Sequence, residues 1–205
     1  MSHYFTDPKG AEVRRRVDVR FWDTDWTFTT ANEVFSAERL DLGTAVLLRE
    51  SAPPADATRL LDLGCGWGVL AVALATGCPA AIVDAVDVNP RALALTADNA
   101  RAHGVGERVH ARTPDEVDDE VRYDEIWSNP PIRIGKDALH ALLATWLPRL
   151  KPGGTARLVV GRNLGADTLQ RWLIDQGWTC ERVASAKGFR VFAVRAALDS
   201  TTRRH

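Results

Sequence analysis

The chain has 205 residues, enough for one domain with a full hydrophobic core and too few for two large domains. Hydrophobic residues make up 45% of it and charged residues 26%, which is ordinary for a globular protein. The formal net charge of −1 excludes a protein that is basic over its whole surface, so a nucleic-acid partner would have to be bound by local patches.

The sequence shows no pattern of a secretion signal, a membrane span or a cysteine motif. No run of eighteen apolar residues occurs, and residues 1–4 lack the basic-then-apolar pattern of a secretion signal. We therefore expect a cytoplasmic protein without a membrane partner. Cys65, Cys78 and Cys180 are scattered and lack C-x-x-C spacing, so we expect neither a disulfide framework nor a metal site.

The N-terminal part predicts a hairpin and a helix. Residues 12–30 alternate between apolar and polar side chains, which indicates two half-exposed strands with a turn at 23–25. We interpret residues 1–40 as a hairpin extension that packs on the main domain. Residues 41–50 predict an amphipathic helix, which ends before two consecutive prolines.

Strands and helices alternate from Arg59 onward. Apolar runs predict strands at 59–63, 81–86, 107–112, 123–128 and 155–160, with helices at about 67–76, 90–103, 137–150 and 165–176. Gly153-Gly154 predicts a tight turn, and 178–194 predicts two more strands with a turn at Lys187-Gly188. This pattern predicts an α/β fold with a doubly wound, mostly parallel sheet over residues 41–197, followed by a frayed tail at 198–205.

The string from Asp62 to Gly68 predicts a cofactor-binding turn. Its pattern D-x-G-x-G-x-G lets a ligand approach the backbone closely, and the helix that follows offers free N–H groups. The third glycine comes one position earlier than in a dinucleotide fingerprint, which favours a cofactor without pyrophosphate and with a cationic or amino-acid moiety. S-adenosylmethionine meets both conditions. Asp87 follows the next strand, where a carboxylate can bind both ribose hydroxyls.

The string Asn129-Pro130-Pro131 predicts an acceptor site. The Asn129 side-chain oxygen and the Pro130 carbonyl can accept the two N–H bonds of a planar amine and leave its lone pair perpendicular to the plane. Because Gly64, Asp87, Thr113 and Asn129 all follow predicted strands, we expect them at one edge of the sheet. Transfer of a methyl group to the gripped nitrogen then depends mostly on orientation.

The segment Asn129-Pro130-Pro131-Ile132-Arg133-Ile134-Gly135-Lys136 resembles the methyltransferase small domain family, which includes ribosomal RNA guanine-N2 methyltransferases and stand-alone single-domain relatives. His3-Tyr4-Phe5, the stretch from Phe28 to Thr44, and Gly188-Phe189-Arg190 are also similar to those relatives. The resemblance implies a class I fold, Rossmann-like, with a seven-stranded sheet whose last strand is antiparallel. It also implies that Phe35, Gly43 and Thr44 flank S-adenosylmethionine and that Asn129 holds the target amine.

Together, the motifs and the resemblance predict three sets of site residues. The catalytic residues are Asn129, Pro130 and Pro131. The cofactor-binding residues are Phe35, Gly43, Thr44, Asp62, Gly64, Gly66, Gly68, Asp87, Val88, Thr113 and Asn129. The substrate-binding residues are Ile132, Arg133 and Lys136, because the two cations adjoin the place where a flipped base would lie. We expect RNA affinity to depend on salt and to weaken when Arg133 and Lys136 become Ala.

Two positions depart from the family pattern. Ile132 stands where many members carry an aromatic residue that stacks on the target base, so we expect stacking to be weaker or to come from Trp67, Trp127 or Phe189. The acid that binds adenine after the third strand is displaced here, where Thr113-Pro114 precedes Asp115.

The sequence predicts an S-adenosylmethionine-dependent N-methyltransferase that acts on a guanine amine in ribosomal RNA, with the RNA or a ribosomal subunit as partner. Three alternatives stay open. In two of them the acceptor is a protein glutamine amide or a small-molecule amine, and in the third the chain is a non-catalytic RNA-binding relative. A nucleotide-dependent oxidoreductase is disfavoured by the glycine spacing.

Overall fold

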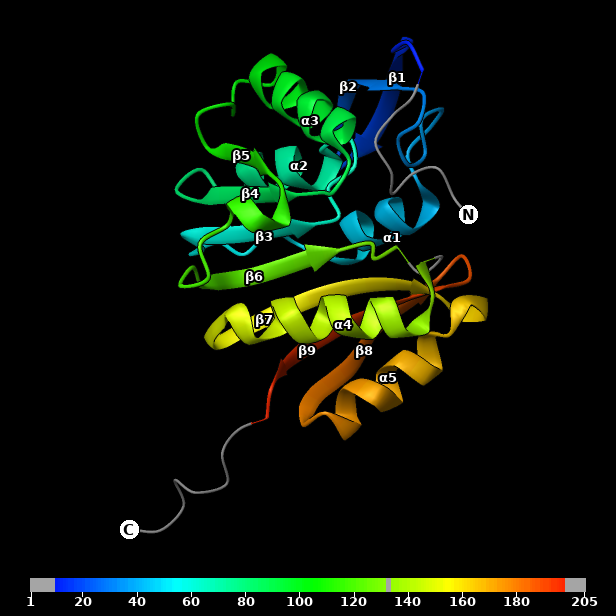
Figure 1. Ribbon diagram of the computed structural model, residues 1–205, viewed down its shortest axis with the longest axis vertical. Helices are drawn as coiled ribbons and strands as arrows, with labels where there is room; N and C mark the ends of the chain where they lie inside the picture. The colour runs from blue at the N-terminus through cyan, green and yellow to red at the C-terminus, as the bar shows by residue number, and fades with distance from the viewer. Residues whose placement is uncertain (1–9, 132–133, 198–205) are drawn as a thin grey trace.

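A computed structural model describes residues 10–131 and 134–197 of the chain. Within these residues, seven strands form one sheet in the order β5-β4-β3-β6-β7-β9-β8, with helices packed against it (Figure 1). β9 runs antiparallel to β7 and β8, and the other pairs in the sheet are parallel. The expected α/β fold, a doubly wound sheet whose last strand is antiparallel, is confirmed.

The strands of this sheet follow the predicted order along the chain. They are β3 (Arg59–Leu63), β4 (Ile82–Val86), β5 (Val109–Arg112), β6 (Tyr123–Ser128), β7 (Leu150–Gly161), β8 (Trp178–Ala186) and β9 (Phe189–Ala196). The helices are α1 (Leu42–Glu50), α2 (Val69–Gly77), α3 (Pro90–Ala102), α4 (Lys136–Trp146) and α5 (Ala166–Asp175), with the short 3-10 turns η2 (Pro114–Glu116), η4 (Leu147–Arg149) and η5 (Arg162–Leu164).

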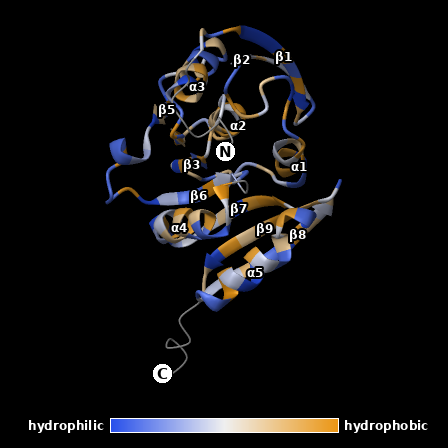
Figure 2. Cartoon of the chain, turned by 45° about the vertical axis from the view of Figure 1, so that its right-hand side comes forward, coloured by the Kyte–Doolittle hydropathy of each residue, from blue (hydrophilic) through white to orange (hydrophobic). Residues whose placement is uncertain are grey.

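Two hydrophobic clusters lie on opposite faces of the sheet. Successive side chains of a strand point to opposite faces, so Leu60 belongs to the cluster under α1, α2 and α3, and Leu61 to the cluster under α4 and α5. Both side chains are fully buried. Figure 2 shows the consequence in β7 and β9, which are predominantly hydrophobic, whereas much of β1 is hydrophilic. Among the described residues, no helix is long and apolar enough to cross a membrane.

The segment around Gly153 and Gly154 differs from its prediction. Both glycines lie inside β7, where the pairing passes from Leu150 opposite Tyr123 directly to Thr155 opposite Glu125. The residues between form an irregularity in the strand, and a Cβ on Gly154 would come within 2.9 Å of the Lys151 carbonyl oxygen. Gly153 has a positive φ angle of 79°, so the predicted tight turn lies inside β7, as an irregularity of the strand.

The N-terminal hairpin consists of β1 (Arg14–Phe21) and β2 (Thr24–Ala31). Its two turn residues, Trp22 and Asp23, have positive φ angles of 46° and 56°, as a two-residue hairpin turn requires. The turn therefore lies one residue earlier than predicted.

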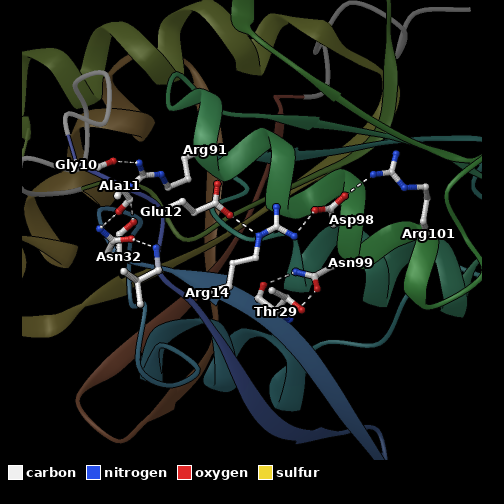
Figure 3. Close-up of polar contacts among 11 residues, drawn as sticks. Gly10, Ala11, Glu12, Arg14, Thr29, Asn32, Arg91, Asp98, Asn99 and Arg101 are labelled. Atoms are coloured by element: carbon white, nitrogen blue, oxygen red, sulfur yellow. Dashed lines mark hydrogen bonds and ion pairs between the residues drawn. The ribbon is translucent and has the colours of Figure 1, made fainter.

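Polar contacts attach this hairpin to α3 (Figure 3). Asn99, which is buried, accepts a hydrogen bond from the Thr29 backbone nitrogen and donates to the Thr29 and Trp67 carbonyl oxygens, all at 2.7–2.8 Å. Arg91, at the start of α3, donates to the Gly10 and Asn32 carbonyl oxygens and to Glu33. These bonds place the segment after β2 beside the glycine turn.

We expect Asn99→Ala to lower the free energy of unfolding by about 3 kcal/mol, because it leaves a buried carbonyl of Trp67 and two partly buried backbone groups of Thr29 without partners. Urea denaturation followed by tryptophan fluorescence measures this change. The neighbouring control Asp98→Ala removes only half-exposed ion pairs and should cost less than about 1 kcal/mol. Equal losses in the two variants would contradict the role given to Asn99.

Candidate active site

The turn after β3 uses its glycines in two different ways. Gly64, Gly66 and Gly68 all have positive φ angles, of 78°, 55° and 87°. A Cβ on Gly66 would meet nothing within 4 Å, and one on Gly64 would meet only Pro131 at 4.0 Å, whereas one on Gly68 would lie 2.9 Å from Thr96 of α3. The first two glycines therefore border open space where a ligand can approach, and Gly68 permits close packing between helices.

Asp87 closes the turn from the next strand. Its carboxylate accepts hydrogen bonds from the backbone nitrogens of Gly66 and Asn89, each at 2.9 Å. Burial raises the pKa of the Asp87 carboxyl, and these backbone bonds act in the opposite direction. Val88, beside it, is 53% exposed. A carboxylate held in this way beside an apolar side chain can accept hydroxyl hydrogens of a ribose.

Asp62 lies fully buried beneath the turn. One carboxyl oxygen accepts the backbone N–H of Ala71 at 2.9 Å, and the other, Oδ1, has no hydrogen-bond partner. Burial raises the pKa of this carboxyl to about 8. Asp62 borders a small cavity of about 40 Å³, which Thr44 also lines. An unpartnered buried acid next to a cavity suits a ligand that carries a positive charge or an N–H donor.

The Asn129 side chain follows the end of β6, and hydrogen bonds to two neighbours fix the orientation of its amide. Its Nδ2 donates to Asp41 Oδ1 at 2.6 Å and to Thr44 Oγ1 at 3.1 Å. A carboxylate only accepts hydrogen bonds, so the atom that faces Asp41 must be the NH₂ group. The carbonyl oxygen of Asn129 therefore points away from Asp41 and remains able to accept.

Asp41 is a site residue that the sequence prediction missed. The same Oδ1 atom that holds Asn129 also accepts the backbone N–H groups of Gly43 and Thr44, which makes Asp41 the N-cap of α1. In sequence an N-cap aspartate has only a structural meaning. Asp41 belongs to the site because it contacts Asn129, and this contact forms only when the fold brings α1 next to β6.

Gly43 permits this approach. A Cβ at Gly43 would lie 2.9 Å from Asp41 Oδ1, 3.0 Å from the Phe189 ring and 3.2 Å from Asn129 Oδ1. No side chain fits there. The first turn of α1 therefore approaches Asn129 and Phe189 at distances that only glycine allows.

One cavity of about 530 Å³ joins the two motifs. Eight of the predicted site residues line it together with Asp41: Phe35, Gly64, Gly66, Asp87, Val88, Asn129, Pro130 and Pro131. Asp62 and Thr44 line the smaller cavity, which Phe35, Gly64, Gly66 and Asn129 also border.

Four predicted site residues do not line either cavity. Gly43 packs behind Asn129, and Gly68 packs against α3. Thr113 precedes η2, where its backbone nitrogen donates to Glu116, and its neighbour Pro114 lines the large cavity instead. Lys136 is exposed at the first position of α4. Ile132 and Arg133 lie outside the described residues, as do His3-Tyr4-Phe5 and the tail 198–205.

The three aromatic candidates for stacking have different environments. Trp67 is buried and donates to the Phe35 carbonyl oxygen at 3.1 Å, and Trp127 is fully buried and donates to Glu125 at 2.6 Å. Phe189 alone of the three lines the large cavity.

Several arginines of β1 and β9 form ion pairs with acids. Arg14 contacts Glu12 and Asp98, Arg15 contacts Glu38, Arg20 contacts Asp25, and Arg190 contacts Asp167. Over the residues that the structure describes, no group of three or more His, Cys, Asp or Glu side chains is placed to hold a metal ion.

The sheet order, the glycine turn and the amide at the end of β6 define the class I methyltransferase architecture. The chain belongs to the methyltransferase small domain family, whose model matches residues 25–193. It is similar to the uncharacterized protein YbxB of Bacillus subtilis, with 30% identity over 169 residues that cover 80% of this chain and 84% of that protein.

Two further relatives carry functional names. The ribosomal RNA small subunit methyltransferase C of Hahella chejuensis is 40% identical over 146 residues, which cover 69% of this chain and 42% of that protein. A 16S rRNA N2 methyltransferase of T. thermophilus, in complex with AdoMet and guanosine, superposes with a TM-score of 0.76 at 23% identity. This match covers 93% of the chain and 52% of that structure, so the chain spans about half the length of these two enzymes.

The raised pKa of Asp62 predicts a pH-dependent stability. Between about pH 4 and about pH 8 the native carboxyl keeps a proton that the unfolded chain has released, so the free energy of unfolding falls as pH rises. The slope is at most about 1.4 kcal/mol per pH unit.

Asp62→Asn should remove this slope, because the amide does not titrate and still accepts the Ala71 N–H. Urea denaturation of both proteins from about pH 5 to about pH 8 measures the difference between the two curves. Parallel curves would show that Asp62 is ionised in the native protein.

Proposed function

We propose that this protein is an S-adenosylmethionine-dependent N-methyltransferase that methylates the exocyclic amine of a guanine in ribosomal RNA. The observation that carries the proposal is the Asn129 amide, whose nitrogen is held by the Asp41 carboxylate and which lines the same cavity as the glycine turn. Membership of the methyltransferase family supports the reaction type.

The residues of the turn fit the cofactor. Gly64 and Gly66 leave room for close approach, and the Asp87 carboxylate suits the two ribose hydroxyls. The unpartnered Asp62 oxygen offers a polar contact for the methionine end of the cofactor. Phe35 and Val88 supply apolar surface on the two sides. When bound, S-adenosylmethionine supplies a methyl group that its sulfonium makes electrophilic.

The acceptor residues orient the amine. Asn129 Oδ1 and the Pro130 carbonyl accept its two N–H bonds, which turns the nitrogen lone pair out of the plane toward the methyl carbon. Asn129 and Pro130 would hold this nitrogen in line with the methyl group that bound S-adenosylmethionine would supply, and the methylated nitrogen would release its proton to solvent. No strong base is needed, since orientation supplies most of the rate enhancement.

The relatives support an RNA acceptor. One matched enzyme is named as a ribosomal RNA methyltransferase, and the structural neighbour was solved with AdoMet and guanosine. The part of those proteins outside the match has no counterpart in the described residues, so the acceptor must be established by experiment.

Two alternative acceptors could bind to the same two groups. A protein glutamine amide and a small-molecule amine both present N–H bonds to an amide oxygen and a carbonyl oxygen. Incubation with labelled cofactor shows which of these acceptors becomes methylated. Ribosomal RNA, ribosomal subunits, release factors and small-molecule extracts are the acceptors to compare. Mass mapping of ribosomal RNA from a strain that lacks the gene would then identify the missing methyl group.

Asn129→Ala tests catalysis against a non-catalytic RNA-binding role. We expect the turnover number to fall about 100-fold or more while cofactor affinity in calorimetry stays within a few-fold, because the amide acts on the acceptor. Gln176→Ala, at an exposed amide beyond the end of α5, is the matched control and should leave turnover unchanged. Full turnover in the Asn129 variant would refute the proposed mechanism.

Asp41 should act by positioning Asn129, and two substitutions isolate that role. Asp41→Asn keeps an oxygen that can accept from Gly43, Thr44 and Asn129, so turnover should stay close to wild type. Asp41→Ser still caps α1 but is too short to hold the Asn129 amide. We expect its turnover number to fall about 10- to 100-fold at unchanged thermal stability and cofactor affinity. Equal turnover in the two variants would exclude positioning by Asp41.

A further inference from the structure

We infer that Phe189, flanked by Arg162 and Lys187, forms the dock for the acceptor nucleotide: the ring stacks on the target base and the two cations contact the neighbouring phosphates. The inference rests on the proposed function and adds to it the residues that recognise an unstacked RNA nucleotide.

Phe189 lies in the same part of the cavity as Asn129. It is the first residue of β9 and pairs with Gly161 at the end of β7. Its ring and the Asn129 amide oxygen both lie within 3.2 Å of the same point beside Gly43. An aromatic ring in this corner can lie against the plane of a base whose amine is held by Asn129.

The surroundings of Phe189 are apolar on the cavity side. Pro131 and Leu164 line the same cavity, and Leu164 is 53% exposed. The other two aromatic candidates cannot take this role, because Trp67 and Trp127 are buried and their indole N–H groups are already bound. Phe189 can therefore supply the stacking surface that the family places one residue after the two prolines, where this chain has Ile132.

Two cations flank the ring. The Arg162 backbone nitrogen donates to the Gly188 carbonyl oxygen at 2.8 Å, which joins η5 to the turn between β8 and β9 and brings Arg162 next to Lys187. Both side chains are exposed, and neither forms an ion pair within residues 10–131 and 134–197. In Figure 1 this turn and η5 lie at the edge to which the β7 arrowhead points.

The hairpin carries more arginines, but most of them are paired. Arg14, Arg15 and Arg20 of β1 each contact a carboxylate, so most of the charge of this strand is neutralised. Arg162 and Lys187 have no such partner in the described part of the chain to give up when they contact a phosphate. An aromatic ring with unpaired cations on its flank is the arrangement by which proteins bind single-stranded or flipped nucleotides.

The test compares matched variants in binding to a fluorescent guanosine-containing single-stranded RNA oligonucleotide and in methylation of 16S and 23S rRNA transcripts. Phe189→Leu keeps apolar bulk and removes the ring, whereas Phe189→Tyr keeps the ring. We expect the leucine variant to lose about 10- to 100-fold in kcat/KM for RNA at unchanged cofactor affinity, and the tyrosine variant to stay close to wild type.

The cations are tested by their salt dependence. Arg162→Gln with Lys187→Gln should reduce the slope of log affinity against log salt by about 1.5, as expected for two lost phosphate contacts. The control pair Arg171→Gln and Arg182→Gln changes the net charge equally, at exposed cations that also form no ion pair within the described residues but do not adjoin the cavity. It should leave the slope unchanged.

The outcomes separate this inference from the proposed function. The inference about Phe189 and the two cations is wrong if the wild type methylates RNA and the leucine variant has the same kcat/KM. It is also wrong if both cation pairs change the salt slope equally. In either case the proposed function stands. If the leucine variant fails to fold, the cation pairs decide alone. Methylation of a protein or small molecule in place of RNA would overturn both.

Discussion

The hydrogen bond between the Asn129 side-chain nitrogen and the Asp41 carboxylate decides what the site presents to a ligand. An asparagine amide carries an NH₂ donor and a carbonyl acceptor, and without a fixed neighbour it can turn either of them toward a ligand. Asp41 removes that freedom because it can only accept. The same oxygen caps α1, so the orientation of one amide is tied to the start of a helix. The N-terminal segment is thereby part of the site.

The fold supplies this constraint through its topology. β3 and β6 are neighbours in the sheet although they lie far apart in the chain, and their carboxyl ends bring the glycine turn and Asn129 to one edge. Trp67 binds the segment around Phe35 to that edge, and Asn99 binds the hairpin to it. The cavity is thus formed by pieces from most of the described chain, and each is held by buried polar contacts as well as by apolar packing.

The alternation of continuous apolar strands with helices was sufficient to predict the sheet, because burial on both faces leaves a strong pattern in sequence. Local geometry was harder to predict: the tight turn at Gly153 and Gly154 lies inside β7 and not before it, since the pairing of β6 with β7 is a property of two strands. In the site, the glycine turn, Asp87 and Asn129 were recognisable by motif. Asp41 was not, because an N-cap residue looks the same whether or not another side chain uses its oxygen.

The contact between Asn99 and Thr29 also bears on how the protein behaves at high concentration. A two-stranded ribbon has outer edges whose N–H and C=O groups can recruit a strand from another molecule. Asn99 occupies both of these groups on Thr29 with its side-chain amide, in the manner of one residue of an additional strand. A helix side chain therefore covers part of the edge of β2, which disfavours self-association by strand addition at that point.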